Sequence, residues 1–296
     1  MRSIFIPTLI CLTFLTALHG VEEGATKPVT HSFLAADYGG NKVYIVNAEG
    51  NITWQYPAVC PQDIWLLKNG NILLSHLLGV KEVTREKSTV WEYTVEEPNE
   101  VHSCQPLKNG NYMVAVAGPC QIREIDHTGK IVKTVNLKTV TKDPHLQMRI
   151  ARKLSNDNYL VGHFGDKAVR EYDWNGKMIR EIKTDGNVYA GYRLPNGNTL
   201  ISLGDAHKII EVDDTDKIVW QVNENDLEGN PLRFAAGMQR LENGNTVVAN
   251  WGGHGHVGQQ PQLFEVTPDK KVVWQVLDNK LGTISNMNIL GRTDSD

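Results

Sequence analysis

The fold of this chain is decided by residues 63–95, which read DIWLLKNGNILLSHLLGVKEVTREKSTVWEYTV. Polar turn residues divide this stretch into four short apolar runs, at Asp63 to Leu67, Ile72 to His76, Lys81 to Thr84 and Thr89 to Val95. The first two runs flank the turn Asn69-Gly70-Asn71. Because Asn and Gly tolerate the positive φ angles that tight hairpins need, the stretch predicts four short antiparallel strands.

The same pattern recurs along the whole chain. Five copies of the hairpin turn are preceded by a leucine, and these leucines are spaced by 40 or 47 residues, at Leu67, Leu107, Leu154, Leu194 and Leu241. A second signature, a turn residue before an apolar pair and often Trp, marks the fourth strand and begins at Gly50, Lys87, Gly129, Gly176, Asp216 and Lys270. Six outer strands predict an all-β, six-bladed β-propeller with four antiparallel strands per blade.

The two ends of the repeat array fit together. Residues Phe33 to Tyr56 supply three strands without an innermost one, and Thr283 to Leu290 has the pattern of an inner strand with no hairpin after it. We therefore expect the C-terminal strand to complete the N-terminal blade, which leaves no repeat with an unpaired edge. The prediction is a single propeller domain over residues 32–290, followed by a tail at 291–296.

The N-terminus differs from the rest of the chain. Met1-Arg2 precedes an uncharged run from Ile4 to Leu18, and the acidic pair Glu22-Glu23 follows shortly after. This pattern predicts a signal peptide over residues 1–20 and a linker at 21–31, hence a secreted or periplasmic protein with no membrane span after cleavage. An uncleaved anchor helix is the alternative.

Composition and motifs restrict the class of function. The chain has 296 residues, 41% of them hydrophobic, and a formal net charge of -4, which gives no general electrostatic reason to bind nucleic acid. No serine-hydrolase elbow, phosphate-binding loop or His-Glu-x-x-His helix occurs. Beyond the leader, either Cys104 pairs with Cys120, or these two and Cys60 are buried free thiols.

The histidines are the main functional clue. In such a blade, the second-to-third loops and the connections between blades lie on one face of the ring. Seven of the ten histidines are assigned to that face by the repeat phase: His76, His102, His145, His163, His207, His254 and His256. Imidazoles titrate near neutral pH and ligate metals, so we expect these seven to converge on an axial funnel. The structural alternative is a set of hydrogen-bonded imidazoles at strand ends.

Other residues extend this candidate site. The glycine-rich stretch Asn250 to Gln260 includes His254-Gly255-His256, which can present two imidazoles to one ion or can be a mobile linker. The candidate metal ligands are His145, His163, His254 and His256. Asp166 and Asp205 can orient an imidazole or act as turn residues. Arg149 and Arg152 suit an anion, although Arg152 can also cap a strand. Together with Asn250, Arg149 and the seven histidines are the candidate ligand-binding residues.

From Ser32 to Leu290 the chain resembles exported bacterial propellers of the PQQ-binding-like or arylsulfotransferase-like repeat group. The segments that carry the resemblance are Val101-His102-Ser103, Asp143-Pro144-His145, Asn158 to His163, Val169 to Asp173 and Gln260 to Pro268. The resemblance implies the propeller fold without an assigned reaction. PQQ itself is not expected, because quinoprotein dehydrogenases have eight blades and commonly a vicinal cysteine pair.

Two functions follow from these observations. The first is binding of a small anionic or metal-associated ligand, or of an extracellular partner protein, at the histidine-rich face, and a divalent metal is the cofactor to test. The alternative is group transfer or hydrolysis of an anionic ester. Arylsulfotransferases use an axial histidine that is transiently sulfated, so this resemblance gives His102, His163 and Arg149 catalytic roles.

Overall fold

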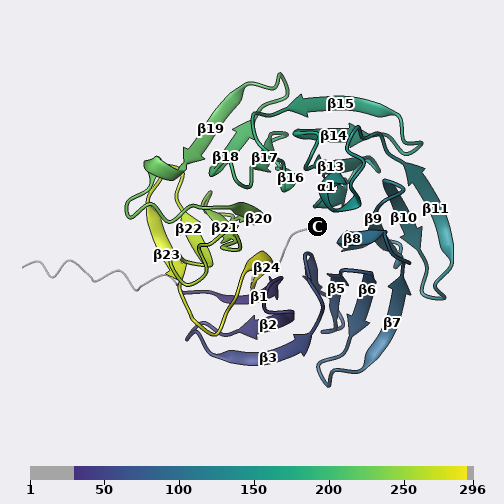
Figure 1. Ribbon diagram of the computed structural model, residues 1–296, viewed down its shortest axis with the longest axis horizontal. Coiled ribbons are helices and arrows are strands. Elements are labelled where there is room, and N and C mark those ends of the chain that lie inside the picture. The colour runs from purple at the N-terminus through teal and green to yellow at the C-terminus, as the bar shows by residue number, and fades with distance from the viewer. Residues whose placement is uncertain (1–29, 292–296) are drawn as a thin grey trace, which may run out of the picture.

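The computed structural model describes residues 30–291 and has six four-stranded antiparallel sheets arranged around a central axis (Figure 1). This confirms the predicted six-bladed β-propeller. The predicted signal peptide (1–20), almost all of the linker (21–31) and the tail after residue 291 lie outside the described residues. Within residues 30–291, no helix is both long and apolar enough to cross a membrane.

Each blade runs from an inner strand at the axis to an outer strand at the rim. Blade 1 contains β24 (Ile284–Leu290), β1 (Ser32–Asp37), β2 (Lys42–Val46) and β3 (Ile52–Pro57), and blade 2 contains β4 (Ile64–Leu66), β5 (Ile72–His76), β6 (Gly79–Val83) and β7 (Thr89–Thr94). Blade 3 contains β8 (Glu100–Pro106), β9 (Tyr112–Ala117), β10 (Gln121–Ile125) and β11 (Ile131–Asn136), and blade 4 contains β12 (Ala151–Lys153), β13 (Tyr159–His163), β14 (Ala168–Tyr172) and β15 (Met178–Lys183). Blade 5 contains β16 (Ala190–Arg193), β17 (Thr199–Ser202), β18 (Lys208–Val212) and β19 (Ile218–Asn223), and blade 6 contains β20 (Ala235–Arg240), β21 (Thr246–Asn250), β22 (Leu263–Val266) and β23 (Val272–Val276).

The Asn-Gly turns form the inner hairpins. In blade 2, the backbone N–H of Gly70 donates to the carbonyl of Leu67 at 2.9 Å, and the N–H of Leu67 donates to the carbonyl of Asn71 at 2.8 Å. Gly70 has φ +85°, a conformation that glycine adopts without steric cost. Blade 4 has Asp157 at the equivalent position with φ +66°, and an aspartate side chain tolerates that region better than most.

The C-terminal strand closes the ring, as predicted. β24 pairs antiparallel with β1 from Ser32 opposite Leu290 to Asp37 opposite Ile284, so the innermost strand of blade 1 comes from the far end of the chain. Ile284, Met287 and Ile289 are buried by this pairing. Figure 1 shows the yellow β24 beside the purple β1 at the axis.

A glutamate on the third strand links each of blades 2 to 6 to the blade that follows it. The donors are Tyr112 to Glu82, Tyr159 and Lys153 to Glu124, Arg193 to Glu171, Arg240 to Glu211, and His31 to Glu265. Blade 1 has the buried Ile45 at the equivalent position, where it packs in one core cluster with Ile72 of blade 2. At this position the junction between blades 1 and 2 is therefore apolar, whereas the other five junctions are polar.

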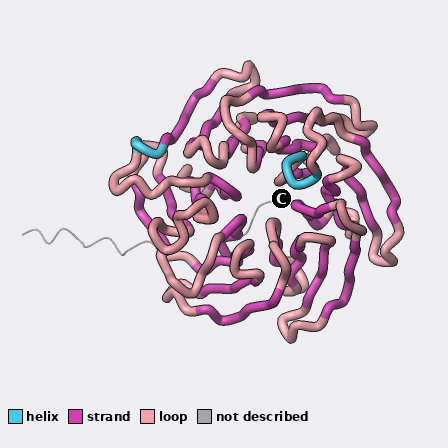
Figure 2. The backbone as a smooth tube through the Cα atoms, viewed as in Figure 1, coloured by secondary structure: helices cyan, strands magenta, loops and turns pink. Residues whose placement is uncertain are grey.

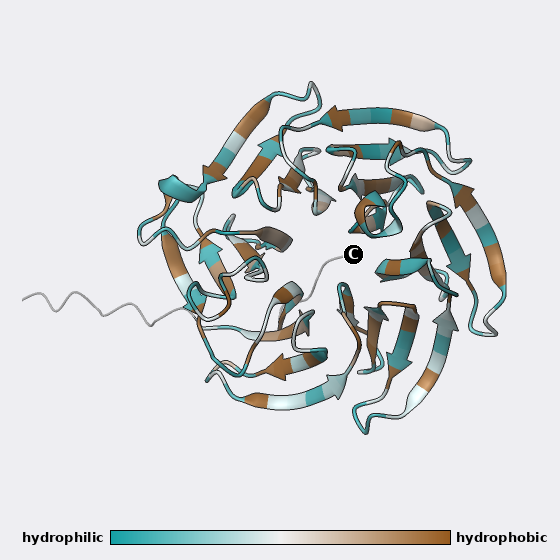
Figure 3. Cartoon of the chain, viewed as in Figure 1, coloured by the Kyte–Doolittle hydropathy of each residue, from teal (hydrophilic) through white to brown (hydrophobic). Residues whose placement is uncertain are grey.

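Tryptophans on the outer strands join the blades near the rim. The indole N–H of Trp54 donates to the carbonyl of Arg85, and the indoles of Trp91 and Trp220 donate to the carbonyls of Asp126 and Pro268. Each acceptor lies in the third-to-fourth turn of the next blade. Along the outer strands hydrophobic and hydrophilic residues alternate, as the colours of Figure 3 show, because one side faces solvent.

Candidate functional site

The connection between blades 3 and 4 brings a short helix to the axis. Helix α1 (Pro144–Gln147) lies beside the centre of the ring, whereas the 3-10 helix η1 (Glu224–Asp226) lies at the rim (Figure 2). Asp143 caps α1, because its carboxylate accepts a hydrogen bond from the backbone N–H of His145 at 3.0 Å. The cap and Pro144 at the first helical position start the turn that carries His145 over the beginning of β8.

Three side chains meet at this point. The Nε2 atom of His102 lies 2.6 Å from Oε2 of Glu100, and Nδ1 of His145 lies 2.8 Å from the same oxygen. One potential ligand atom from each residue lies within 4.8 Å of the other two, and among residues 30–291 this is the one group of three that can hold a metal ion. His145 and Glu100 are 41% and 21% exposed, so the cluster is open to solvent on one side.

His102 is the buried member of the cluster. It lies at a β-bulge, because the register of β8 against β9 shifts between Val101 and Ser103, and bulges redirect side chains near functional sites. Burial and the nearby Arg149 lower the pKa of His102 to about 4, so its imidazole is neutral at neutral pH. Burial raises the pKa of Glu100, but hydrogen bonds from His102 and His145 outweigh it and hold that pKa well below its usual range.

A neutral imidazole has one proton for its two nitrogens. The Nδ1 atom of His102 lies 2.6 Å from the carbonyl oxygen of Met148, and Nε2 lies beside Glu100. Without an ion, the proton on Nε2 is donated to Glu100; if an ion binds at Nε2, the proton is on Nδ1 and is donated to Met148. Histidines that ligate a metal through one ring nitrogen commonly donate the N–H of the other nitrogen to a backbone carbonyl in this way.

Arg149 lies next to the cluster as an unpaired buried cation. It is 6% exposed, its Nη1 donates to the carbonyl of His145, and the same atom lies 3.0 Å from Nδ1 of His102. Its guanidinium carbon lies 4.8 Å from the centroid of Phe164. No carboxylate of the described residues lies within 4.0 Å of Arg149, whereas the equally buried Arg170 pairs with Asp166 and Glu181. A buried charge without a counter-ion is costly, and burial lowers the pKa of Arg149.

Aromatic side chains continue from Arg149 along the same face. The ring centroids of Tyr38 and Trp251 are 6.1 Å apart, those of Trp251 and Phe234 are 5.0 Å apart, and those of Phe234 and Tyr189 are 5.8 Å apart. Together with Phe164, these four residues are called the aromatic arc. Burial and the neighbouring Cys60 raise the pKa of Tyr38 to about 12, and the charge of Arg149 opposes this shift.

Asn250 holds the backbone next to the aromatic arc through hydrogen bonds. Its Oδ1 accepts the backbone N–H groups of Arg233 and Phe234, at 2.8 and 3.1 Å, and its Nδ2 donates to the carbonyls of Pro231 and Pro261. Asn250 is 2% exposed and uses its amide on these backbone groups. Its contacts in the structure therefore position Phe234.

The other five histidines predicted for the site do not join the cluster of Glu100, His102 and His145. His76 faces Glu92 on the outer strand β7 at 3.9 Å, and Nδ1 of His207 lies 2.6 Å from Glu224 in η1 at the rim. The expectation that all seven imidazoles converge on one opening is therefore wrong, because a side chain at the end of a second strand can also turn outward. The structure brings His102 and His145 together, with ring centroids 5.6 Å apart.

The two histidines of the glycine-rich loop also differ from each other. Nδ1 of His254 lies 2.7 Å from Asp205, and its ring packs edge-on against Trp251 at 4.8 Å. Nδ1 of His256 is buried without a hydrogen-bond partner. His254 thus lies at the end of the aromatic arc, while ligand binding by His76, His163, His207, His254 and His256 stays a prediction.

His163 is enclosed in blade 4. Its Nε2 lies 2.9 Å from the hydroxyl of Tyr172, and Asp166, which was a candidate to orient it, instead accepts hydrogen bonds from Thr139, Thr141 and Arg170. Burial, and then the charge of Arg170, lower the pKa of His163 to about 3.

This shift predicts a loss of stability in acid. His163 is protonated near pH 6.5 in the unfolded chain but stays neutral in the folded protein. Its contribution to the free energy of unfolding is therefore fully present above pH 6.5 and is lost as the pH falls toward 3. We expect His163 to account for about 2 kcal/mol of the decrease in unfolding free energy between pH 7 and pH 5. Urea unfolding of the wild type and of His163→Gln at both pH values measures this difference. An equal decrease in the two proteins would contradict it.

A buried ion pair joins the inner parts of the blades. Arg152 donates Nη1 and Nη2 to the two carboxylate oxygens of Asp63, at 2.7 and 2.9 Å. Ser103 and Asn286 donate to the same carboxylate, so strands from four blades meet there. Arg152 therefore has an internal counter-ion and does not cap a surface strand. Neither Asp63 nor Glu100 was predicted from the sequence, although each is an acidic residue at the start of an inner strand.

The three cysteines of residues 30–291, Cys60, Cys104 and Cys120, are all free. Cys104 packs between blades 2 and 3, and Cys120 packs between blades 3 and 4. Since the two thiols belong to different hydrophobic clusters, the predicted alternative of a Cys104–Cys120 disulfide is wrong. Cys60 is only half-buried.

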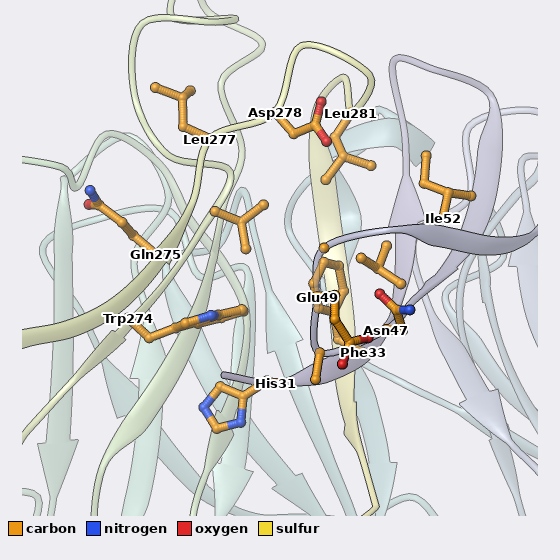
Figure 4. A pocket seen from close by; sticks show the side chains of 14 residues that line it. His31, Phe33, Asn47, Glu49, Ile52, Trp274, Gln275, Leu277, Asp278 and Leu281 are labelled. Carbon is orange, nitrogen blue, oxygen red and sulfur yellow. The ribbon is translucent and has the colours of Figure 1, made fainter. Parts of the chain in front are cut away.

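A separate pocket lies at the junction of blades 6 and 1. Figure 4 shows His31 against Trp274, with Phe33, Asn47 and Leu281 along the wall. Nε2 of His31 lies 2.5 Å from Glu265, and its ring packs edge-on against Trp274 at 4.8 Å. His31 is therefore part of the blade junction, and the axial cluster remains the candidate site.

Comparisons with known proteins support the fold. A family model described as Mal s 1 allergenic protein-like matches residues 136–271. A Bacteroides caccae protein of unknown function has 34% sequence identity and a TM-score of 0.80, with 88% of this chain and 98% of that chain covered. No curated protein matches this chain in sequence.

Two lyase structures share the fold at low identity. A streptogramin B lyase has 13% identity and a TM-score of 0.58, with 84% of this chain and 85% of that chain covered. A catalytically inactive virginiamycin B lyase from Staphylococcus aureus with quinupristin has the same identity and TM-score, with 87% of each chain covered. At this identity, the likeness is one of fold.

Proposed function

The chain belongs to the family of the Bacteroides caccae propeller protein, and we propose that it binds a divalent metal ion with Glu100, His102 and His145, and through that ion a small anionic ligand. The single observation that carries this proposal is the approach of three ligand atoms to within 4.8 Å, with the second nitrogen of His102 held by the carbonyl of Met148. Two imidazoles and a carboxylate suit Zn²⁺ and the neighbouring first-row ions.

The remaining coordination positions favour an external ligand. Three protein ligands leave at least one position of a four-coordinate ion free, which is typical of metal sites that bind substrate or water. The exposed edge of the cluster, formed by His145 and Glu100, gives a route to that position. The positive charge of Arg149 beside the ion favours a ligand that is an anion.

Binding has more support than group transfer. The side chain of His102 is 0% exposed and both of its nitrogens have partners, so an ester has no path to a nucleophilic His102. The predicted signal peptide supports a secreted or periplasmic location. An extracellular partner protein at this face, and membership in the PQQ-binding-like or arylsulfotransferase-like group, stay predictions.

Titration of the metal-free protein with ZnCl₂ tests the proposal. We expect one Zn²⁺ per chain by calorimetry, and His145→Ala should weaken binding at least a hundredfold because it removes a ligand. His145 is 41% exposed, so this variant should still fold. His207→Ala is the matched control, since His207 also contacts a glutamate at 2.6 Å but has no third ligand. Equal affinity in the two variants would contradict the proposal.

A further inference from the structure

We infer that the anion bound at the axis is carried on an aromatic ring, so that the ligand class is an aryl carboxylate, sulfate or phosphate. The inference rests on the proposed function for the location of the site, but it depends on other residues, Arg149 and the aromatic arc. One side of the ligand would meet the guanidinium and the other would meet aromatic faces.

The anion half of the inference comes from the unused edge of Arg149. Its Nη1 donates to the carbonyl of His145 and lies beside Nδ1 of His102, but Nε and Nη2 have no hydrogen-bond partner among the described residues. Both atoms retain access to solvent, because neither of them is fully buried without a partner. Nε and Nη2 form a two-pronged donor edge that matches the two oxygens of a carboxylate, sulfate or phosphate.

The aromatic half comes from the side chains next to that edge. Phe164 lies against the guanidinium at 4.8 Å and packs in one hydrophobic cluster with Tyr189, Phe234 and Trp251. Trp251 and Tyr38 are half-buried and come from the loops of blades 6 and 1. Aromatic faces bind planar rings by offset stacking and edge-to-face contacts, which gives them a preference for an aromatic ligand over an aliphatic one.

The position of Trp251 is built into the loop. Its backbone N–H donates to the carbonyl of Phe234 at 3.0 Å. A Cβ atom on Gly253 would come within 2.1 Å of the indole ring, so glycine is required for the ring to fold back over the loop. His254 packs on the indole and is tied to Asp205 of blade 5. The indole is therefore held in place before any ligand arrives.

The test compares three probes on the full chain: 2-naphthoate, cyclohexanecarboxylate and the neutral 2-naphthalenemethanol. Calorimetry with and without Zn²⁺ should give at least tenfold tighter binding for 2-naphthoate than for either of the others. Trp251→Leu should remove this preference and leave the Zn²⁺ affinity unchanged. Arg149→Met should weaken both carboxylates and leave the neutral alcohol unchanged.

The outcomes separate the two proposals. If Zn²⁺ binds but 2-naphthoate and cyclohexanecarboxylate bind equally, or neither binds, the inference is overturned and the metal site stands. If 2-naphthoate binds tightly with the Trp251 dependence but Zn²⁺ does not bind, the inference stands and the metal proposal fails. Preference for the neutral alcohol over 2-naphthoate would also overturn the inference, because Arg149 would then have no anion to bind.

Discussion

A chain that ends after Leu281, and therefore lacks β24, is expected not to fold. β24 supplies the innermost strand of blade 1, and its buried Ile284, Met287 and Ile289 contribute about 1.5–3 kcal/mol each, or about 5–9 kcal/mol together. That is comparable to the whole stability of a typical domain, about 5–15 kcal/mol. Removal would also expose the edge of β1, which invites aggregation. Circular dichroism and gel filtration would show the loss of the cooperative folded state.

The same truncation offers its own control. A synthetic peptide of residues 282–291 should restore a soluble folded complex, because it can pair with β1 in the register of Ser32 opposite Leu290. A peptide of the same composition in scrambled order should not. A truncated chain that unfolds cooperatively at the temperature of the wild type would show that β24 does not close the ring.

The fold could be predicted because its signals are local and repeat. The Asn-Gly turn at Gly70 needs a positive φ, and a turn of that kind between two apolar runs predicts a hairpin wherever it occurs. Counting five inner hairpins against six outer strands then required a strand from elsewhere. The pattern of Thr283 to Leu290 matched that missing strand, and the pairing of β24 with β1 confirmed it.

The site was predictable only in part, because its geometry depends on contacts that the repeat does not encode. The repeat phase assigned His102 and His145 to the same face, and the structure brings them together. It could not show that His207 turns to Glu224 at the rim, since both directions are open to a loop side chain. Glu100 was missed because its role depends on the bulge at His102 and on a helix more than forty residues further along.

The glutamates between the blades were also missed, for a different reason. Glu82 and its equivalents repeat at a fixed place on the third strand, so their period is visible in the sequence. Their partners vary, from the hydroxyl of Tyr112 to the guanidiniums of Arg193 and Arg240. A search for a repeated pair therefore fails, whereas a search for a repeated acidic residue on a buried strand would have found them.

Asp63→Leu is expected to lower the unfolding free energy by about 3–5 kcal/mol, the cost of leaving a buried cation without its partner. Asp63 is 0% exposed and accepts both prongs of Arg152 as well as Ser103 and Asn286. Since the removed carboxylate holds inner strands of four blades, the loss should appear as a lower midpoint in urea with a single cooperative transition. The measurement is urea unfolding at pH 7, followed by circular dichroism.

Removing both charges should cost less than removing one. In Asp63→Leu with Arg152→Leu, no buried ion is left unpaired, and replacing a buried ion pair by apolar side chains is often close to neutral. Asp269→Ala, which breaks the exposed pair with Lys271, is the surface control and should leave the midpoint unchanged. If the double variant loses as much as the sum of the two single variants, the axial ion pair is not the origin of the effect, and the side-chain volume at the axis is the better explanation.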